Sequence, residues 1–374
     1  EGFSEGGSEL LMGQEGLYLE PPREDLDWSS LKFSYTKCPS LVISDIDISD
    51  GTDGGKWSSP RAIPHEPLKL EPSAGALNYG QTIFEGIKAF RHDDGSINIF
   101  RIDENAKRLQ RSAERILIPQ VPEEIFVRAV KMCCAWNSSY VPPYGSGGAL
   151  YLRPLVVATE PHLGVRASKA FRLVVYATPV GPFFSKPEGL ALRLVTDFHR
   201  SYAKGVGATK MGGNYAPCIK SVDEARQKGY DGVLHLDAEG RGLIEEGTGA
   251  NFFALVDGVL RTPSTHRKTI LEGITRDSVC YLARHVLGMT VVDDEDLPVE
   301  LVRTAEQAFC TGTAVTVSSV KRIGHEADSD MVVCKSLDLA EELKVILADI
   351  QFGRREGPEG WLTRVTPSDL EPLS

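Results

Sequence analysis

The grouping of strand-like and helix-like stretches most constrains the fold of this chain. Runs rich in Val, Leu and Tyr, which are typical of β-strands, cover residues 149–159, 171–179 and 190–196. Two short runs on either side of residues 237–241 predict a hairpin, and residues 251–260 predict another. Because strands form hairpins and helices are kept apart from them, the sequence predicts an α+β fold rather than a doubly wound one.

Four segments have the apolar spacing of amphipathic helices. The clearest covers residues 103–117, where Ala106, Leu109 and Ala113 share one helical face and Asp103 is the expected N-cap. The others cover residues 123–137, 273–287 and 336–352.

The stretch Gly181–Gly189 (GPFFSKPEG) is punctuated by proline and glycine and predicts a linker between two domains. At 374 residues the chain is long enough for two. We expect an N-terminal domain over residues 1–180, which includes a polar, turn-rich extension over residues 1–60. We expect a C-terminal domain over residues 190–374.

The charge balance excludes one class of partner. The chain has 41 Lys and Arg residues against 52 Asp and Glu, a formal net charge of −11. Binding to nucleic acid requires clustered basic residues, so we expect no nucleic-acid partner. No apolar run approaches the roughly 20 residues of a spanning helix, and we expect no membrane partner either.

The cysteines and histidines predict no metal centre. The seven cysteines are scattered and form no C-x-x-C, and the eight histidines lack metal-ligand spacing. The pattern is typical of reduced thiols, so we expect an intracellular protein, cytoplasmic or mitochondrial. The first residues carry no recognisable targeting signal, and a leader removed before Glu1 remains an alternative.

A glycine-rich segment around Lys210 offers the clearest chemistry. By itself the segment KGVGATKMGGNY, residues 204–215, is more simply a surface loop with two solvated lysines. A lysine can also react with carbonyls as a nucleophile, and pyridoxal phosphate (PLP) is the usual carbonyl partner. A PLP site needs a lysine, an acid that faces the pyridine nitrogen, and donors around the phosphate.

The rest of the chain supplies these groups. Glu246 is followed by the small residues Gly247–Gly249, which let the backbone approach a ligand closely. Residues 273–275 begin a helix, whose N-terminal N–H groups suit phosphate, and residues 311–314 form a second turn of small and hydroxyl residues. Arg108 is a candidate phosphate donor, with a surface ion pair to Glu104 as the alternative.

The chain resembles the branched-chain-amino-acid aminotransferases of eukaryotic type, which are class IV, fold type IV PLP enzymes. The resemblance covers about residues 68–361 in unbroken order. It rests on nine segments: LNYGQTIFEGIKAFR (77–91), RLQRSAER (108–115), LYLRP (150–154), TEPHLGV (159–165), PVGPFF (179–184), KMGGNYAP (210–217), EEGTGANFF (245–253), EGITRDSV (272–279) and TGTA (311–314). The family fold implies a small α/β domain beside a larger, pseudo-barrel-like α+β domain.

The resemblance implies a role for each cofactor-binding residue. Lys210 is the catalytic residue, which carries PLP as an internal aldimine and moves the proton between the substrate and the cofactor. Tyr215 bonds the phenolic oxygen and Glu246 pairs with the pyridine N–H. The remaining residues of the cofactor site are Arg108, Gly249, Ile274, Thr275 and Thr313.

The resemblance also implies a substrate pocket. Arg153 would meet the acidic side chain of glutamate, and aromatic side chains would enclose a branched aliphatic one. Val165 would come from the neighbouring subunit, so the active unit would be a homodimer. The implied substrate-binding residues are Tyr79, Phe84, Tyr151, Arg153, Val165, Phe183, Thr313 and Ala314.

The implied reaction is a ping-pong transamination of L-leucine, L-isoleucine or L-valine with 2-oxoglutarate. Alternatives with the same fold are a D-amino-acid or (R)-amine transaminase, an aminodeoxychorismate lyase, and an aminotransferase of secondary metabolism. A PLP-binding protein without turnover is a further alternative. The chain departs from the family pattern at Phe183, where animal relatives have Tyr, and at Glu245 and Glu272, which add negative charge near the site.

Overall fold

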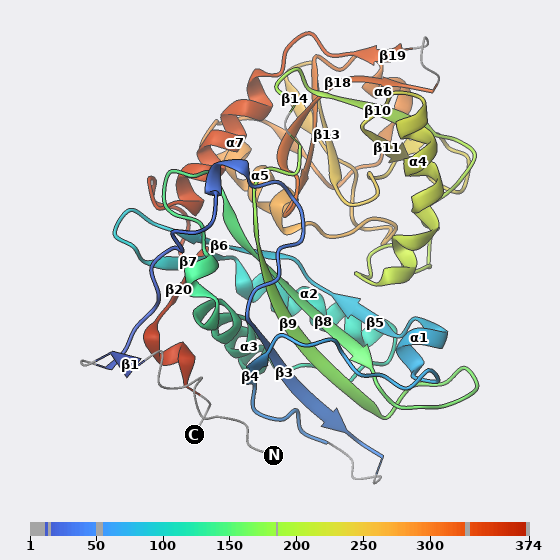
Figure 1. Cartoon of the computed structure of the whole chain (residues 1–374). Coiled ribbons are helices and arrows are strands. Elements are labelled where there is room, and N and C mark those ends of the chain that lie inside the picture. The colour runs from blue at the N-terminus through green and yellow to red at the C-terminus, as the bar shows by residue number, and fades with distance from the viewer. Residues whose placement is uncertain (1–11, 14–15, 50–54, 185, 326–329, 372–374) are drawn as a thin grey trace. The chain divides into compact units, whose positions relative to one another are not determined.

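The computed structural model describes residues 12–13, 16–49, 55–184, 186–325 and 330–371. They form two units (Figure 1). The first contains the described residues up to Pro182 together with those from Gln351 onward, and the second runs from Phe183 to Ile350. Both units combine a sheet with separate helices, which confirms the expected α+β class.

The first unit is built on one antiparallel sheet. Its strand order is β20-β7-β6-β8-β9-β3-β4, with β5 paired to β8. The bounds are β3 Ser40–Asp47, β4 Arg61–Pro64, β5 Thr82–Phe84, β6 Ile87–Arg91, β7 Ile97–Phe100, β8 Ala149–Ala158, β9 Ala170–Val180 and β20 Leu362–Val365. The long pair β8 and β9 confirms two of the predicted strands and forms the middle of the sheet.

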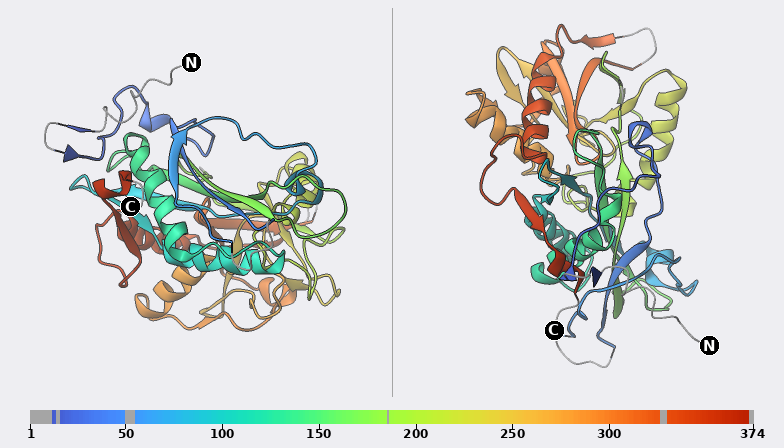
Figure 2. Two further views of the ribbon diagram at one scale, coloured as in Figure 1. Left: turned by 90° about the horizontal axis from the view of Figure 1, so that it is seen from below. Right: turned by 60° about the vertical axis from the view of Figure 1, so that its left-hand side comes forward.

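Two helices follow the sheet strand β7 and pack in the same unit (Figure 2). Helix α2 covers Ile102–Arg115 and α3 covers Glu123–Trp136, as the apolar spacing predicted. Asp103 is not the N-cap: that position is held by Arg101 in the left-handed region, and Asp103 lies in the first turn. An acidic residue there still suits the positive end of the helix dipole.

The extension expected over residues 1–60 contains a buried strand. In β3 the residues Leu41–Ser44 are buried, and β3 lies between β9 and β4 in the sheet. The prediction of a polar, turn-rich extension was therefore wrong for this segment. The β-branched residues of SLVISDID fit a strand, but the polar stretches on either side obscured them.

The C-terminal segment also differs from expectation, because it belongs to the first unit. Strand β20 pairs with β7, and the 3-10 helix Pro367–Leu370 packs on α3. Asp369 binds Arg128 at 3.0 Å and Lys131 at 3.1 Å, and both basic residues lie on α3. These contacts hold the end of the chain against the first sheet (Figures 1 and 2).

The second unit has a mixed sheet with the order β11-β10-β18-β17-β13-β14-β15, and β19 pairs with β18. Its bounds are β10 Leu190–Val195, β11 Gly232–His235, β13 Asn251–Val256, β14 Val259–Arg261, β15 Val291–Val292, β17 Gln307–Gly312, β18 Thr316–Gly324 and β19 Asp330–Val333. A two-stranded sheet joins β12 (Leu243–Ile244) to β16 (Leu297–Pro298). The hairpin β13–β14 confirms the prediction over residues 251–260.

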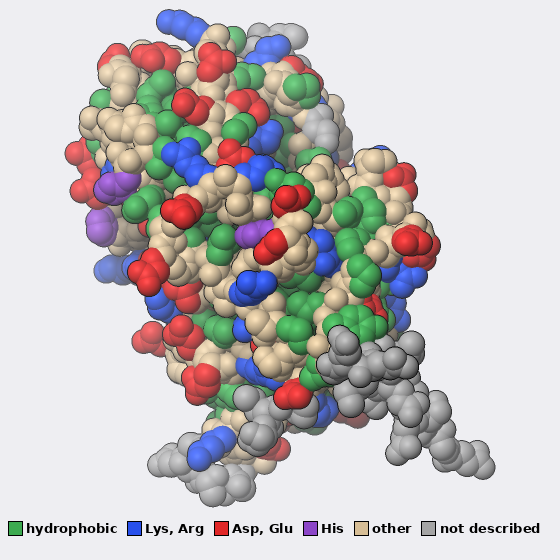
Figure 3. Space-filling model, turned by 90° about the vertical axis from the view of Figure 1, so that its left-hand side faces the viewer, with side chains coloured by type: hydrophobic (Ala, Val, Ile, Leu, Met, Phe, Trp, Pro, Cys, Tyr) green, Lys and Arg blue, Asp and Glu red, His purple; other side chains and the backbone are tan. Residues whose placement is uncertain are grey.

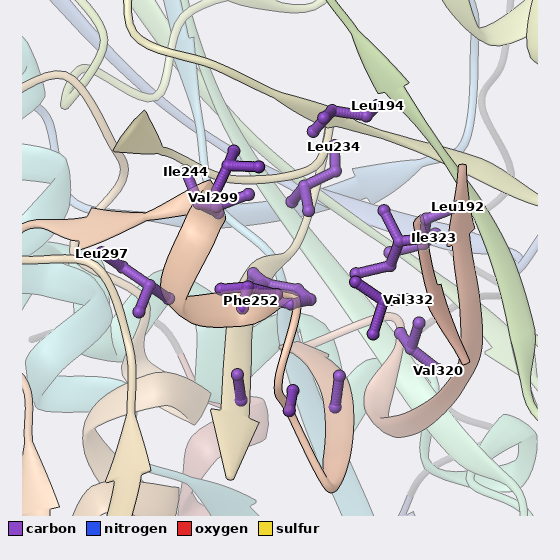
Figure 4. Packing of buried hydrophobic residues seen from close by; sticks show 14 of the residues in the cluster. Leu192, Leu194, Leu234, Ile244, Phe252, Leu297, Val299, Val320, Ile323 and Val332 are labelled. Atoms are coloured by element: carbon purple, nitrogen blue, oxygen red, sulfur yellow. The ribbon is translucent and has the colours of Figure 1, made fainter. Parts of the chain in front are cut away.

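The core of the second unit gathers apolar side chains from most of these strands. Phe252 is fully buried among Leu234, Ile244, Val299 and Val320 (Figure 4). Among its described residues, the α-helices of this unit are α4 Ile219–Gln227, α5 Ile274–His285, α6 Val299–Val302 and α7 Asp338–Gln351, whose last residue already belongs to the first unit. Helices α5 and α7 confirm two of the sequence predictions.

Short elements complete the described chain. They are β1 Met12–Gly13, β2 Gly16–Leu17 and α1 Gly75–Tyr79, with further 3-10 turns at Trp28–Ser30, Ser138–Tyr140, Gly212–Asn214 and Ala216–Cys218. Acidic and basic side chains are interspersed on the face shown in Figure 3. Among the described residues, no helix is long and apolar enough to cross a membrane.

The packing of Phe252 gives a stability prediction. Phe252→Ala should lower the free energy of unfolding of the second unit by about 3–5 kcal/mol, because it leaves a cavity in a closed core. Urea unfolding measures the change. Val345→Ala, at a side chain that is 55% exposed on α7, should cost less than about 1 kcal/mol. Equal losses in the two variants would contradict this description of the core.

Candidate active site

Lys210 lies in a turn that also carries Tyr215. The Lys210 Nζ donates a hydrogen bond to Tyr215 Oη at 3.1 Å, and it lies 5.4 Å from the centre of the same ring. Asn214 fixes the turn, because its side-chain amide donates to the carbonyl oxygens of Val206 and Thr209, each at 2.7 Å. The structure thus brings together the two residues that the sequence placed five positions apart.

Glu246 is a buried carboxylate that accepts from several donors. Its Oε1 lies 2.8 Å from Nη1 of Arg200 and accepts the backbone N–H of Leu271 at 3.0 Å. Its Oε2 accepts the side-chain amide of Asn251 at 3.0 Å. Since Arg200 is itself buried, the pair is a desolvated ion pair, which holds its geometry only when such additional hydrogen bonds are present.

Two segments of small residues approach each other in the second unit. Gly249 follows Glu246, and Gly312 ends β17. A Cβ at Gly312 would lie 3.2 Å from the carbonyl oxygen of Gly249, so the approach leaves little room for a larger residue. Thr313 and Ala314 follow in the turn before β18 and are partly exposed.

Helix α5 begins at Ile274 directly after Gly273, with no side-chain cap. The first N–H groups of a helix have no partner within the helix, and they favour an anion such as phosphate. Thr275 lies in this first turn and is buried. The helix start that the sequence predicted is confirmed; its role in phosphate binding stays a prediction.

In the first unit, neighbouring strands place an aromatic and basic cluster on one face of the sheet. Tyr151 and Arg153 alternate along β8, and Phe84 at the end of β5 lies beside them. Arg153 donates to Tyr151 Oη at 2.9 Å and lies 4.8 Å from the centre of the Phe84 ring. A Cβ at Gly86 would lie 2.1 Å from Tyr151 Oη, so a larger residue there would displace the Tyr151 side chain from this cluster.

Arg108 is buried in the first unit and pairs with Glu85. Its Nε lies 2.8 Å from Glu85 Oε1 and its Nη2 lies 2.6 Å from Oε2. The alternative of a surface ion pair with Glu104 is wrong, because Glu104 pairs with Lys107 instead. The bidentate pair uses one edge of the guanidinium, so a phosphate would have to bind the other edge.

The other predicted substrate residues are more exposed. Tyr79 Oη accepts the backbone N–H of Gly164 at 2.7 Å, which anchors the loop that carries Leu163 and Val165. These two apolar side chains are 85% and 92% exposed. Phe183 belongs to the second unit, is partly exposed, and packs edge-on against Phe184 at 4.6 Å between ring centres.

The sequence analysis missed three residues that hold the predicted ones in place: Arg200, Asn251 and Glu85. Glu85 and Asn251 lie within matched segments, in FEG and GAN, but their roles depend on partners distant in the chain. Arg200 follows β10 in a segment without a motif, so no local signal marked it.

The comparisons with known proteins identify the family. Residues 82–323 match the model of the family described as amino-transferase class IV. A branched-chain-amino-acid aminotransferase of Helicobacter pylori is 36% identical, over 92% of this chain and 99% of its own. The transaminase htyB of Aspergillus rugulosus is 34% identical, over 93% of this chain and 95% of its own.

Solved structures are similar as well. The crystal structure of the T.th. branched-chain amino acid aminotransferase with pyridoxamine 5'-phosphate has a TM-score of 0.72 and 29% identity, covering 89% of this chain and 100% of that one. The same enzyme complexed with N-(5'-phosphopyridoxyl)-L-glutamate has a TM-score of 0.70.

The fold is therefore fold type IV, and the protein is an enzyme, a transaminase. The chain belongs to the class IV aminotransferase family, and the resemblance that its motifs indicated is confirmed.

The Arg200–Glu246 pair gives a second prediction. Arg200→Met should lower the free energy of unfolding by about 3–5 kcal/mol, because it leaves the Glu246 carboxylate buried without its cation. The double variant Arg200→Met/Glu246→Gln should recover part of this loss. Arg193→Met is the control: Asp197 and Glu224, the partners of Arg193, are partly exposed, so its loss should be smaller. A double variant no more stable than Arg200→Met would contradict the prediction.

Proposed function

We propose that the protein transfers amino groups between L-branched-chain amino acids (Leu, Ile and Val) and 2-oxoglutarate, with PLP as its cofactor. The products are the branched-chain 2-oxo acids and L-glutamate. The observation that carries the proposal is the hydrogen bond between Lys210 and Tyr215, in the same unit as the buried carboxylate of Glu246. The relatives named above add support, because three of the four matches are described as branched-chain enzymes.

The second unit fits PLP in three respects. Glu246 is a fixed acceptor, and an opposite charge of this kind stabilises a protonated pyridine nitrogen. The start of α5 at Ile274 and Thr275 has the unbonded N–H groups that suit a phosphate. The close approach of Gly249 and Gly312 leaves backbone rather than side chains at the edge of the site. We also propose Thr313 as a phosphate contact, and we propose Arg108 as one on the family resemblance alone.

When bound, PLP would supply an aldehyde that takes up the amino group and a ring that withdraws electrons from the reacting carbon. The chain supplies the proton transfer: Lys210 Nζ would remove the proton from the α-carbon of the amino acid and return it at a different carbon. Tyr215 Oη accepts from Lys210 Nζ and so orients the amine. Each half-reaction ends with release of one product, and the order is therefore ping-pong.

The first unit supports the choice of substrates. Phe84 and Tyr151 offer apolar surface for a branched side chain, and the Arg153 guanidinium offers a cation for the side-chain carboxylate of glutamate. The family resemblance also assigns substrate contacts to Tyr79 and Phe183, and it assigns binding of the α-carboxylate to the backbone at Thr313 and Ala314.

A homodimer is part of the proposal. The side chains of Leu163 and Val165 are almost fully exposed on a loop that Tyr79 anchors. Apolar side chains exposed together are typical of a protein interface. We propose that this loop reaches the site of a second copy of the chain, with Val165 against the substrate.

A transaminase with a different substrate is the second candidate. It is favoured by the 34% identity to transaminase htyB, whose name states no branched-chain substrate, and by the partly exposed Phe183. Amino donors assayed one at a time separate the candidates: L-leucine should be the better donor, whereas activity with D-alanine alone would indicate a D-amino-acid enzyme. A cofactor band that no donor shifts would indicate a PLP-binding protein without turnover.

Lys210 gives the third prediction. Lys210→Gln should lower transamination of L-leucine by at least about 10³-fold, because the nucleophile and the proton carrier are the same amine. It should also remove the visible absorbance band of the lysine-bound cofactor. Lys204→Gln, at an exposed lysine six residues earlier in the same segment, should leave both unchanged. Full activity in Lys210→Gln would refute the proposed function.

Arg153 gives the fourth prediction. Arg153→Gln should raise the KM for 2-oxoglutarate by roughly 10–100-fold, because a charge-assisted hydrogen bond to the carboxylate is lost. The KM for L-leucine should change by less than about threefold, since its side chain carries no charge. Steady-state kinetics with each substrate varied in turn gives both values. Arg364→Gln, at an exposed arginine of β20, is the control, and equal effects of Arg153→Gln on both substrates would contradict the assignment.

A further inference from the structure

A second buried glutamate, Glu245, lies next to Glu246 and has very different partners. Glu245 follows β12, and its backbone N–H donates to the carbonyl oxygen of His235 at 2.9 Å. Its side chain is buried, but among the described residues it forms no ion pair, and its Oε1 has no hydrogen-bond partner. Its Oε2 lies 3.0 Å from the hydroxyl of Ser201.

The single hydrogen of the Ser201 hydroxyl constrains the protonation state of the Glu245 carboxyl group. The same Ser201 hydroxyl lies 2.5 Å from the backbone carbonyl oxygen of Thr269. A hydroxyl carries one hydrogen and a carbonyl oxygen can only accept, so the shorter contact takes the Ser201 hydrogen. The contact with Glu245 is then a hydrogen bond only if the carboxyl group carries a hydrogen of its own and donates it to Ser201 Oγ.

The charge count leads to the same conclusion. Arg200 is the cation that faces both glutamates, and its Nη1 lies 2.8 Å from Glu246. Burial lowers the pKa of the neighbouring His235 to about 4, so this imidazole supplies no positive charge at neutral pH. Two ionised carboxylates beside one guanidinium would leave a net negative charge in the interior, and such a charge is costly when it is not neutralised.

We propose that Glu245 is an uncharged carboxylic acid in the folded protein and that it donates a hydrogen bond to Ser201. In this state Glu245 does not compete for the Arg200 guanidinium, which stays paired with Glu246. Glu245 therefore acts as a positioning residue. Burial raises the pKa of Glu245 to about 7, with a further upward contribution from Glu246. The Thr269 hydroxyl and the charge of Arg200 oppose this rise. The acid is therefore neutral below about pH 7 and loses its proton as the pH rises.

Ionisation of Glu245 would create a competitor for Arg200. The Arg200 Nε is buried and has no hydrogen-bond partner among the described residues, so the guanidinium has an N–H available for a second carboxylate. A shift of Arg200 toward Glu245 would weaken its hold on Glu246. The protonation state follows from the chain alone, whereas the effect on the cofactor through Glu246 rests on the proposed function.

Unfolding at several pH values tests the protonation state. In the unfolded chain a glutamate ionises near its ordinary pKa of 4.5, whereas Glu245 in the folded protein holds its proton to about pH 7. Wild-type stability contributed by this group should therefore fall as the pH rises from about 4.5 to about 7. Glu245→Gln keeps a donor but cannot ionise, so the unfolding constant of wild type relative to the variant should rise by about 70-fold between pH 5 and pH 8.

Glu342→Gln, at an exposed glutamate of α7, is the matched control and should show no such trend. An equal effect of Glu245→Gln at both pH values would overturn the proposal, and so would an opposite trend, which an ionised Glu245 would produce.

Infrared difference spectra of the full-length wild-type protein provide a test that does not depend on the folding of Glu245→Gln. The carbonyl band of a buried carboxylic acid should be present at pH 6 and absent at pH 9, and Ser201→Ala should shift it, because the acceptor is lost. Absence of the band at pH 6 would overturn the proposal.

The holoenzyme tests the positioning role. The absorbance of the bound cofactor should titrate near neutral pH in wild type, and this step should be missing in Glu245→Gln. If Glu245→Gln kept this titration step, the result would contradict the positioning role. No cofactor band in wild type at any pH would instead refute the proposed function, and the unfolding and infrared results would still decide the state of Glu245.

Discussion

The buried ion pair between Arg200 and Glu246 is the interaction on which the candidate site depends. It joins the segment after β10 to the segment before β13, and the backbone N–H of Leu271 and the side chain of Asn251 add hydrogen bonds to the same carboxylate. Asn251 also binds the carbonyl oxygen of Leu271. Three stretches of chain that are remote in sequence are thereby fixed around one charged group.

The first unit has a comparable arrangement around Glu85. Arg108 binds this carboxylate with two N–H groups, and Asn105 of the same helix donates to it at 2.8 Å. Each unit thus has a buried glutamate that accepts several hydrogen bonds and holds an arginine in place. The net charge of the whole chain does not reveal these buried pairs. The net charge of −11 describes the surface, whereas the interior pairs its charges locally.

Local patterns in the sequence predicted local structure well. The helices α2, α3, α5 and α7 and the hairpin β13–β14 follow from apolar spacing and turn residues, which act over a few positions. The N-cap of α2, the buried strand β3 and the pairing of β20 with β7 were not predicted, because each depends on partners distant in the chain. The motif residues Lys210, Tyr215 and Glu246 were found by their resemblance to a family, but Arg200 was not, since only the folded chain brings it to Glu246.

The placement of β20 makes the second unit an insertion in the first. After β9 the chain leaves the first sheet and forms the whole of the second unit. It then returns to the first sheet, where β20 pairs with β7. During synthesis the strand β20 therefore becomes available to the first sheet only after the whole of the second unit has been made. Until then β7 presents an open edge with unpaired N–H and C=O groups, which is the kind of edge at which β-proteins aggregate. Strand β20 thus covers this edge late, in a sheet whose other strands come from the first half of the chain.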